Sequence, residues 1–204
     1  MDEKEATAAF RFLIALSVRL LIASTTRSSA VELPLANAAR VVFDGTVTTA
    51  AALKAQLASI TPSDTEFRVA FETTHVSNAR YARYYLRSLE MQAKDTADPW
   101  FVPQGDGQVI NLEHVLPRKP ATNWPTFSED DLRLNVTRLG NLALMRASDN
   151  SDLRSDAFSD KREVYAASPY VLTSQIGSVE EWTVATIAER QLGLAALVVK
   201  TWPI

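Results

Sequence analysis

The spacing of apolar residues predicts helices throughout the N-terminal half of the chain. Between residues 6 and 23 apolar side chains recur at intervals of three and four, which is the spacing of one helix face, and the polar run Ser24–Ser29 ends the segment. Three more helices are predicted: over Leu35–Phe43 before Gly45, over Ala50–Ile60 after Thr48 or Thr49, and after the start signal Thr61-Pro62-Ser63-Asp64. Ser77 or Asn78 can cap the helix that follows.

The pattern changes after a loop-like segment at Pro99–Gly107. Short strands are predicted at Val109–Leu116 and Leu139–Met145, and helix starts at Ser128–Asp131, at Ser155 or Ser159, and at the capping box Ser178–Glu181, which opens a long helix toward Val199. The sequence therefore predicts an α+β fold that is mainly helical. A helical region over residues 1–98 leads into a region with both strands over residues 108–204, and the two are expected to form one compact unit.

The first apolar segment raises the question of a membrane. Arg11 and Arg19 interrupt it and an acidic stretch precedes it, whereas a signal peptide begins with basic residues and a spanning helix carries few charges. We therefore expect a buried helix and no membrane association. The alternative is a helix that packs on a partner outside this sequence.

The amino-acid composition limits the kinds of metal and redox site that the chain can form. The chain has 204 residues, of which 47% are hydrophobic and 22% charged, as in ordinary globular proteins. It has no cysteine, which excludes disulfides and cysteine-based zinc sites and suits a cytoplasmic protein. It has two histidines, so a bound metal must use oxygen ligands, which favours Mg²⁺ or Mn²⁺. The net charge of −3 argues against a protein that coats DNA, but not against a local DNA-binding patch.

One constellation of residues points to phosphodiester hydrolysis. Glu113 and His114 close the first predicted strand, Asn141 lies in the second, and Asn150 follows before a predicted helix. Hydrolysis of a phosphodiester needs a base for the attacking water and a cation for the phosphate oxygens. A neutral imidazole, with an ordinary pKa of about 6.5, can be that base. Carboxylate and amide oxygens suit a hard divalent ion.

The segments NLEHVLP, RLGNLALM, the stretch from Asn150 to Tyr165 and WTVATIAER resemble the C-terminal nuclease domain of GmrSD-type modification-dependent restriction enzymes. That domain has a His-x-x-Pro motif and belongs to the HNH, or His-Me finger, superfamily. The resemblance covers Ile110–Ile204 and implies a ββα-metal core and a metal-dependent DNA endonuclease. It also implies defence against phage or foreign modified DNA. The sensor or nucleotide-binding domain with which such proteins usually begin is not recognisable here, so the chain looks like the C-terminal part of a longer protein.

The resemblance assigns roles residue by residue. His114 matches the general base, and Glu113 and Asn150 match the metal ligands, with Asp149 as an alternative ligand. Asn141 matches an asparagine that pins the loop between the strands. Lys161 matches a position often filled by lysine, where it meets phosphate.

Other residues are expected to support this site. Trp182 and Arg190 are expected to pack and position, and His75 to be structural. The candidate DNA contacts are Arg80, Arg83 and Arg87, which share one face of a helix, and Arg118, Lys119 and Arg162, which flank the site. Arg80, Arg83 and Arg87, called here the arginine face, have a second interpretation. They can form an ordinary solvent-exposed helix surface, or they can pair with acidic side chains of the nuclease core.

Two alternatives remain at this point. The chain can be a DNA-binding or partner-docking module whose nuclease site is silent without the missing N-terminal domain. A toxin-like RNase is less favoured, because no aromatic platform for stacking single-stranded bases is evident. The pattern also does not separate nicking by a monomer from double-strand cleavage by a homodimer.

Overall fold

The computed structural model describes residues 1–23, 28–97, 109–120, 122–153 and 156–204, without the side chains of residues 28–29 and 150–152. Residues 1–71 with 198–204 form one compact unit, the N-terminal unit, and residues 72–197 form a second, the central unit. Helices dominate, and the described residues contain one two-stranded sheet, so the mainly helical α+β class is confirmed. The predicted boundary between residues 98 and 108 lies outside the described residues.

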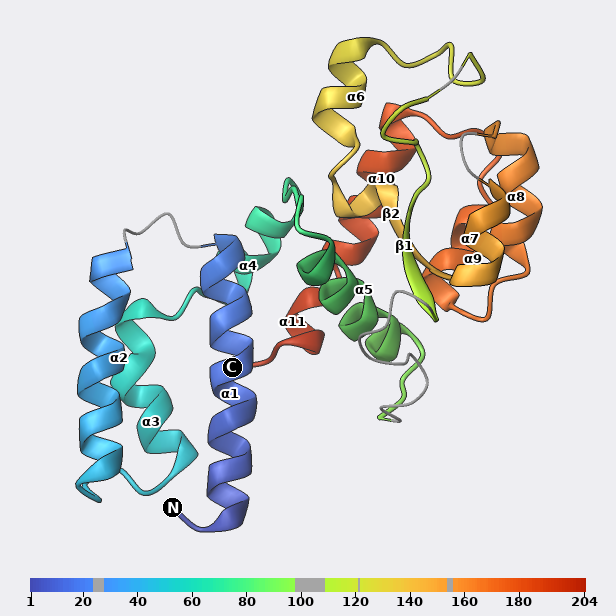
Figure 1. The fold of residues 1–204 in the computed structure, drawn as a ribbon. Helices are drawn as coiled ribbons and strands as arrows, with labels where there is room; N and C mark the ends of the chain where they lie inside the picture. Colours follow the sequence, from blue (N-terminus) through green and yellow to red (C-terminus); the bar gives the residue numbers. More distant parts are fainter. Residues whose placement is uncertain (24–27, 98–108, 121, 154–155) are drawn as a thin grey trace. The chain divides into compact units, whose positions relative to one another are not determined.

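The N-terminal unit is helical. Its elements are α1 (Glu3–Ala23), α2 (Ser28–Phe43), α3 (Ala50–Leu57) with a 3-10 turn η1 (Ala58–Ile60), α4 (Asp64–Phe71) and α11 (Val198–Thr201). Helix α3 packs against α1 and α2, and α4 packs against α1 and α11 (Figure 1). Leu57, Leu16 and Phe12 are among the apolar side chains buried between α1, α2 and α3.

Local capping explains the starts of α3 and α4, and two of the predicted helix starts in this unit need correction. Thr49 caps α3 by accepting from the Ala52 N–H, as predicted. Within the start signal that begins at Thr61, the residue that caps helix α4 is Ser63, because Ser63 and Glu66 exchange hydrogen bonds in a capping box. The Thr61 hydroxyl, for which a capping role was also expected, donates to the preceding helix instead. Helix α2 begins seven residues earlier than predicted and contains Pro34, which the sequence pattern had placed before the helix.

Helix α1 is amphipathic. Phe12, Leu16 and Arg19 are buried, whereas Phe10 and Ile14 are 67% and 53% exposed, so the prediction of a buried helix holds for one face. By length and apolar composition this helix would also suit a membrane span. Core helices of soluble proteins meet the same two criteria, so composition alone does not assign it to a membrane.

Arg19 ties together three parts of the N-terminal unit. Its side chain is fully buried. The guanidinium donates to the Trp202 carbonyl through Nε and Nη2 at 3.0 and 2.9 Å, and to the Pro62 carbonyl at 3.1 Å. It also pairs with Asp64 at 2.7 Å and lies over the Phe67 ring. Every arm of a buried cation thus has an acceptor, as burial of a charge requires.

Replacing Arg19 by Met is expected to lower the free energy of unfolding by about 3 kcal/mol, because buried carbonyls lose their donors. Urea denaturation followed by circular dichroism measures the change. The matched control is Arg11→Met on the exposed side of the same helix, expected to change stability by less than about 0.5 kcal/mol. Equal effects of the two substitutions would contradict the assigned role.

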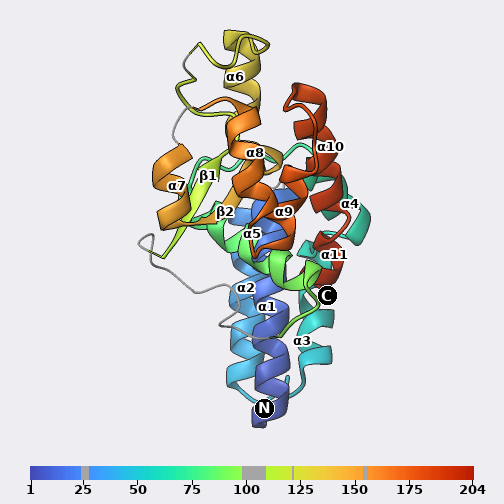
Figure 2. The same ribbon diagram turned by 90° about the vertical axis from the view of Figure 1, so that its right-hand side faces the viewer.

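The central unit surrounds the sheet. Its elements are α5 (Ala79–Ala93), β1 (Ile110–His114), α6 (Glu129–Asn135), η2 (Leu139–Asn141), β2 (Leu142–Arg146), α7 (Ala147–Leu153), α8 (Phe158–Ala166), α9 (Val171–Gly177) and α10 (Val184–Ala195). The strands are antiparallel, with Glu113 opposite Ala143 and His114 opposite Leu142. Helices α5 and α7 contact both strands, and α9 contacts β2 and α8 (Figures 1 and 2).

Several predicted boundaries in the central unit are wrong. Asn141 lies in η2 just before β2, not inside the strand, and Asn150 lies within α7 rather than in a loop before a helix. Helix α8 begins after Ala157, without a side-chain cap from Ser159. The other proposed cap, Ser155, is outside the described residues.

The C-terminal helix is shorter than predicted. Helix α10 starts after Thr183, which forms a capping box with Thr186, and not after Ser178, whose hydroxyl donates to the Gln175 carbonyl at the end of α9. The helix ends at Ala195, and α11 is separate.

A long-range cap fixes α9, which the sequence pattern did not predict. Glu90 of α5 is 1% exposed, and its two carboxylate oxygens accept from the N–H groups of Val171 and Leu172. The carboxylate therefore satisfies two free donors at the positive end of α9 and fastens that helix to α5.

Candidate functional site

His114 is the last residue of β1 and is partly buried. The pKa of its imidazole is lowered to about 4, chiefly by burial and to a smaller extent by the positive charges of Arg118 and Lys161. The ring is therefore neutral at pH 7 and able to accept a proton. Arg118 is exposed and lies four residues after it in the chain.

Glu113 lies beside His114 in the strand, but its carboxylate is buried in a different set of contacts. Its Oε1 atom accepts from the Lys161 ammonium at 2.7 Å and from the Tyr165 hydroxyl at 3.1 Å. The Glu113 and Lys161 side chains are 8% and 0% exposed. Burial raises the pKa of Glu113, while Lys161 and then Tyr165 act in the opposite direction. Burial, together with the Glu113 carboxylate, raises the pKa of Tyr165 well above 10.

The described residues do not fit a divalent ion at Glu113 in this arrangement. The carboxylate already accepts from an ammonium and a phenol, both through its Oε1 atom. No group of three or more His, Asp or Glu side chains that could hold a metal occurs among the described residues. The Asn150 side chain is outside them, and the alternative ligand Asp149 accepts from Ser148. The metal-ligand roles of Glu113 and Asn150 stay predictions.

Asn141 joins the site to its surroundings through all the hydrogen bonds of a buried carboxamide. Its Nδ2 atom donates to the carbonyls of Leu116 at 3.0 Å and Val136 at 3.3 Å. Its Oδ1 atom accepts from the Leu116 N–H at 2.8 Å and the Trp182 indole at 3.1 Å. Leu116 is two residues after His114, so these bonds are consistent with the predicted role of pinning the segment between the strands.

Helix α10 holds η2 from the other side. Arg190 donates through Nη1 to the carbonyl oxygens of Leu139, Gly140 and Leu142 at 3.1, 2.8 and 2.8 Å. Gln191 accepts from the Gly140 N–H, and a Cβ atom at position 140 would overlap the Ile187 carbonyl. The positioning role expected of Arg190 agrees with these contacts. Sequence reasoning missed Gln191, because a glutamine inside a helix gives no local signal of such a bond.

The structure brings only some of the predicted DNA contacts to His114. The positive charge of Arg118 acts on the His114 ring, and Lys119 is exposed beside Arg118. Lys161 is fully buried and bound to Glu113, so its ammonium does not face solvent to meet a phosphate.

The arginine face lies on α5, which contacts both strands. Arg80 is exposed, and Arg83 and Arg87 are partly buried. These cations are therefore on a helix fixed to the strand that carries His114.

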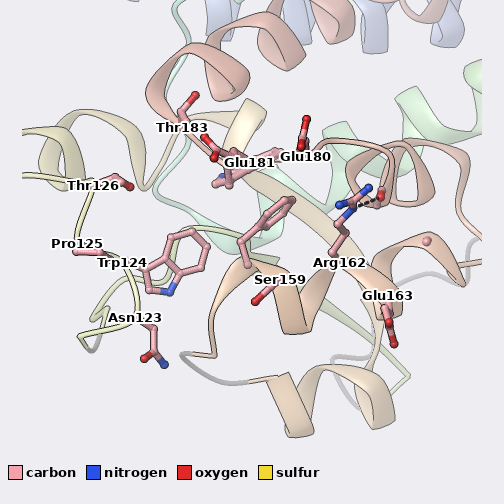
Figure 3. A pocket seen from close by; sticks show the side chains of 14 residues that line it. Asn123, Trp124, Pro125, Thr126, Ser159, Arg162, Glu163, Glu180, Glu181 and Thr183 are labelled. Carbon is pink, nitrogen blue, oxygen red and sulfur yellow. Dashed lines mark hydrogen bonds between the residues drawn. The ribbon is translucent and has the colours of Figure 1, made fainter.

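A separate pocket of about 680 Å³ lies on the central unit (Figure 3). Trp124, Phe158 and Trp182 give it aromatic walls, and neither His114 nor Glu113 lines it. Arg162 lies there, with its Nε atom donating to the Gly177 carbonyl at 3.0 Å. Three carboxylates also line the pocket, from Glu163, Glu180 and Glu181. An excess of negative charge disfavours a phosphate in it.

The ring signal of His114 is expected to titrate with a midpoint near pH 4. The chain has two histidines, so ring NMR spectra contain two signals, and His75→Gln identifies which is which. The unfolded chain takes up this proton at about pH 6.5. His114 therefore makes stability rise with pH between about 4 and 6.5. A folded-state midpoint at or above about 6.5 would contradict the buried, neutral imidazole.

Comparison with known proteins agrees with the resemblance seen in the motifs. The family model of GmrSD restriction endonucleases, C-terminal domain, matches residues 61–197. The match begins upstream of the first strand and includes α4 and α5. No curated protein matches the chain. Since the match covers more than half of the sequence, this chain belongs to the family of C-terminal domains of GmrSD restriction endonucleases.

Proposed function

We propose that this domain is a divalent-metal-dependent DNA endonuclease of the HNH type that acts in defence against phage or foreign modified DNA. The family is one of restriction endonucleases. The observation that carries the proposal is a partly buried imidazole at the end of β1 whose pKa is lowered to about 4, in part by the charge of the exposed Arg118. The order of β1, β2 and α7, with α7 against both strands, supports a ββα core.

In the proposed reaction the His114 imidazole takes a proton from a water molecule as the water oxygen bonds to phosphorus. The bond between phosphorus and the 3′ oxygen breaks, and that oxygen takes up a proton from solvent, which leaves a 5′ phosphate and a 3′ hydroxyl, as the resemblance implies. Arg118 is close enough for its charge to act on His114, so it can also stabilise the phosphate on which His114 acts.

Metal dependence is part of the proposal and rests on the family resemblance. Mg²⁺ or Mn²⁺ is the expected ion. The described residues do not form its site, so no catalytic step is assigned to the ion here. DNA is the proposed substrate, an N-terminal sensor domain and a second copy of this chain are the proposed partners, and the cytoplasm is the proposed compartment.

Cleavage of supercoiled plasmid tests the activity and its base together. Wild type is expected to form open circles or linear DNA with Mg²⁺ or Mn²⁺ and to be inactive in EDTA. His114→Ala should lower the rate by about 10²–10⁴-fold, because it removes the general base. His75→Ala, which changes the second histidine of the chain, is the matched control and should retain activity. Full activity of His114→Ala would refute the assigned mechanism.

The rival function is a DNA-binding module whose nuclease site is silent in isolation. Arg80 is exposed on α5, which favours this rival because a cationic helix face can bind phosphates without cleavage. The rival predicts that changing Arg80, Arg83 and Arg87 to Ala abolishes salt-dependent binding, with no cleavage at any metal concentration.

The endonuclease proposal makes a different prediction for the two cations after His114. Changing Arg118 and Lys119 to Ala should weaken binding and cleavage together. The slope of log affinity against log salt should fall by about 0.9 for each lost phosphate contact. Fluorescence anisotropy at several salt concentrations, beside the plasmid assay, measures both quantities. Unchanged binding and cleavage would exclude a role for these two residues at the DNA.

A further inference from the structure

We propose that Glu113 is a positioning residue for His114, fixed by a buried ion pair with Lys161, and not a ligand of the metal ion. The inference rests on the proposed nuclease function only where it concerns catalysis. The ion pair itself is a property of the fold. Its two charged atoms are 2.7 Å apart, and both side chains are buried.

The contacts of the pair leave little room for a metal. The Lys161 ammonium and the Tyr165 hydroxyl both donate to the Oε1 atom of Glu113, so a metal ion bound at this carboxylate would have to share it with a buried cation. The lysine side chain is fully buried, and its ammonium lies 5.9 Å from the centre of the Trp124 ring. A dication at Glu113 would therefore stand beside a buried ammonium with like charge, which is costly in a poorly solvated place.

The same contacts suit a positioning role. Lys161 and Tyr165 lie one helical turn apart on α8, and both hold Glu113, which precedes His114 in β1. The backbone of His114 also lowers the pKa of this carboxylate. The pair thus fastens the end of β1 to α8 at the residue before the base, and so fixes the direction from which the imidazole projects.

A double-mutant cycle tests the ion pair in the full chain. Glu113→Gln and Lys161→Met should each lower the melting temperature by about 10 °C, because each leaves a buried charge without its partner. The double variant should lose less than the sum of the two, since no isolated charge remains. Additive losses would overturn the pair. The exposed pair Asp130–Arg133 is the control, and Asp130→Asn with Arg133→Met should shift melting by less than about 2 °C.

Metal binding and kinetics separate positioning from ligation. Mn²⁺ binding, followed by electron paramagnetic resonance without DNA, should change by less than about twofold in Glu113→Gln, whereas loss of a group that orients or binds the metal costs about 10-fold or more. In plasmid cleavage the same variant should lower kcat while KM for DNA and the half-saturating Mn²⁺ concentration stay constant. Weaker Mn²⁺ binding in Glu113→Gln, or tighter binding in Lys161→Met, would overturn the proposal.

Tyr165→Phe keeps the charges of both Glu113 and Lys161, so it tests the positioning role even if the charge-changing variants do not fold. It removes one hydrogen bond to Glu113 and should move the His114 ring signal in NMR spectra while leaving the His75 signal in place. An unmoved His114 signal would overturn the positioning role. If wild type neither binds Mn²⁺ nor cleaves DNA, the proposed nuclease function fails, and the melting cycle and this signal still decide the role of Glu113.

Discussion

The buried carboxamide of Asn141 is the interaction on which the arrangement of the central unit depends. It bonds to both backbone groups of Leu116, to the end of α6 at Val136, and to the Trp182 indole ahead of α10. A buried amide is stable only when each donor and acceptor is satisfied, so η2 and these three segments hold one another in a single arrangement. The segment that follows His114 is thereby fixed, and Arg190 secures the same turn through its carbonyls.

Elements with local signals were predicted from the sequence, and elements that depend on distant residues were not. Asn78 caps α5 and Ser128 caps α6 through bonds to backbone two or three residues away, so their sequence patterns were sufficient. Helix α9 has no such signal, because its N-terminal donors are satisfied by Glu90, which lies on α5. The start of α10 was misplaced because two segments, at Ser178 and Thr183, both carry capping residues; Thr183 forms the capping box, whereas the Ser178 hydroxyl donates to the end of α9.

The candidate site was predicted in the same uneven way. The motif around His114 and the position of Asn141 were found from the order of residues along the chain. The partnership of Glu113 with Lys161 joins residues 48 positions apart, and the acid before the histidine had been interpreted as a metal ligand. The sequence contains a weak indication of this partnership. Lys161 and Tyr165 are four residues apart, so they lie on the same face of a helix and can both donate to one carboxylate. The arginine face on α5 was identified from the spacing of its residues. That α5 packs against both strands was not predictable from this spacing.

Gly140 has a consequence for how such a domain can diverge. Any side chain at this position would overlap the carbonyl of Ile187, and its own N–H is bound by Gln191. The following residue is the fully buried asparagine. A lineage therefore cannot gain a side chain at position 140 without first moving α10 away from the turn, and a replacement of Asn141 leaves buried partners of its carboxamide unsatisfied.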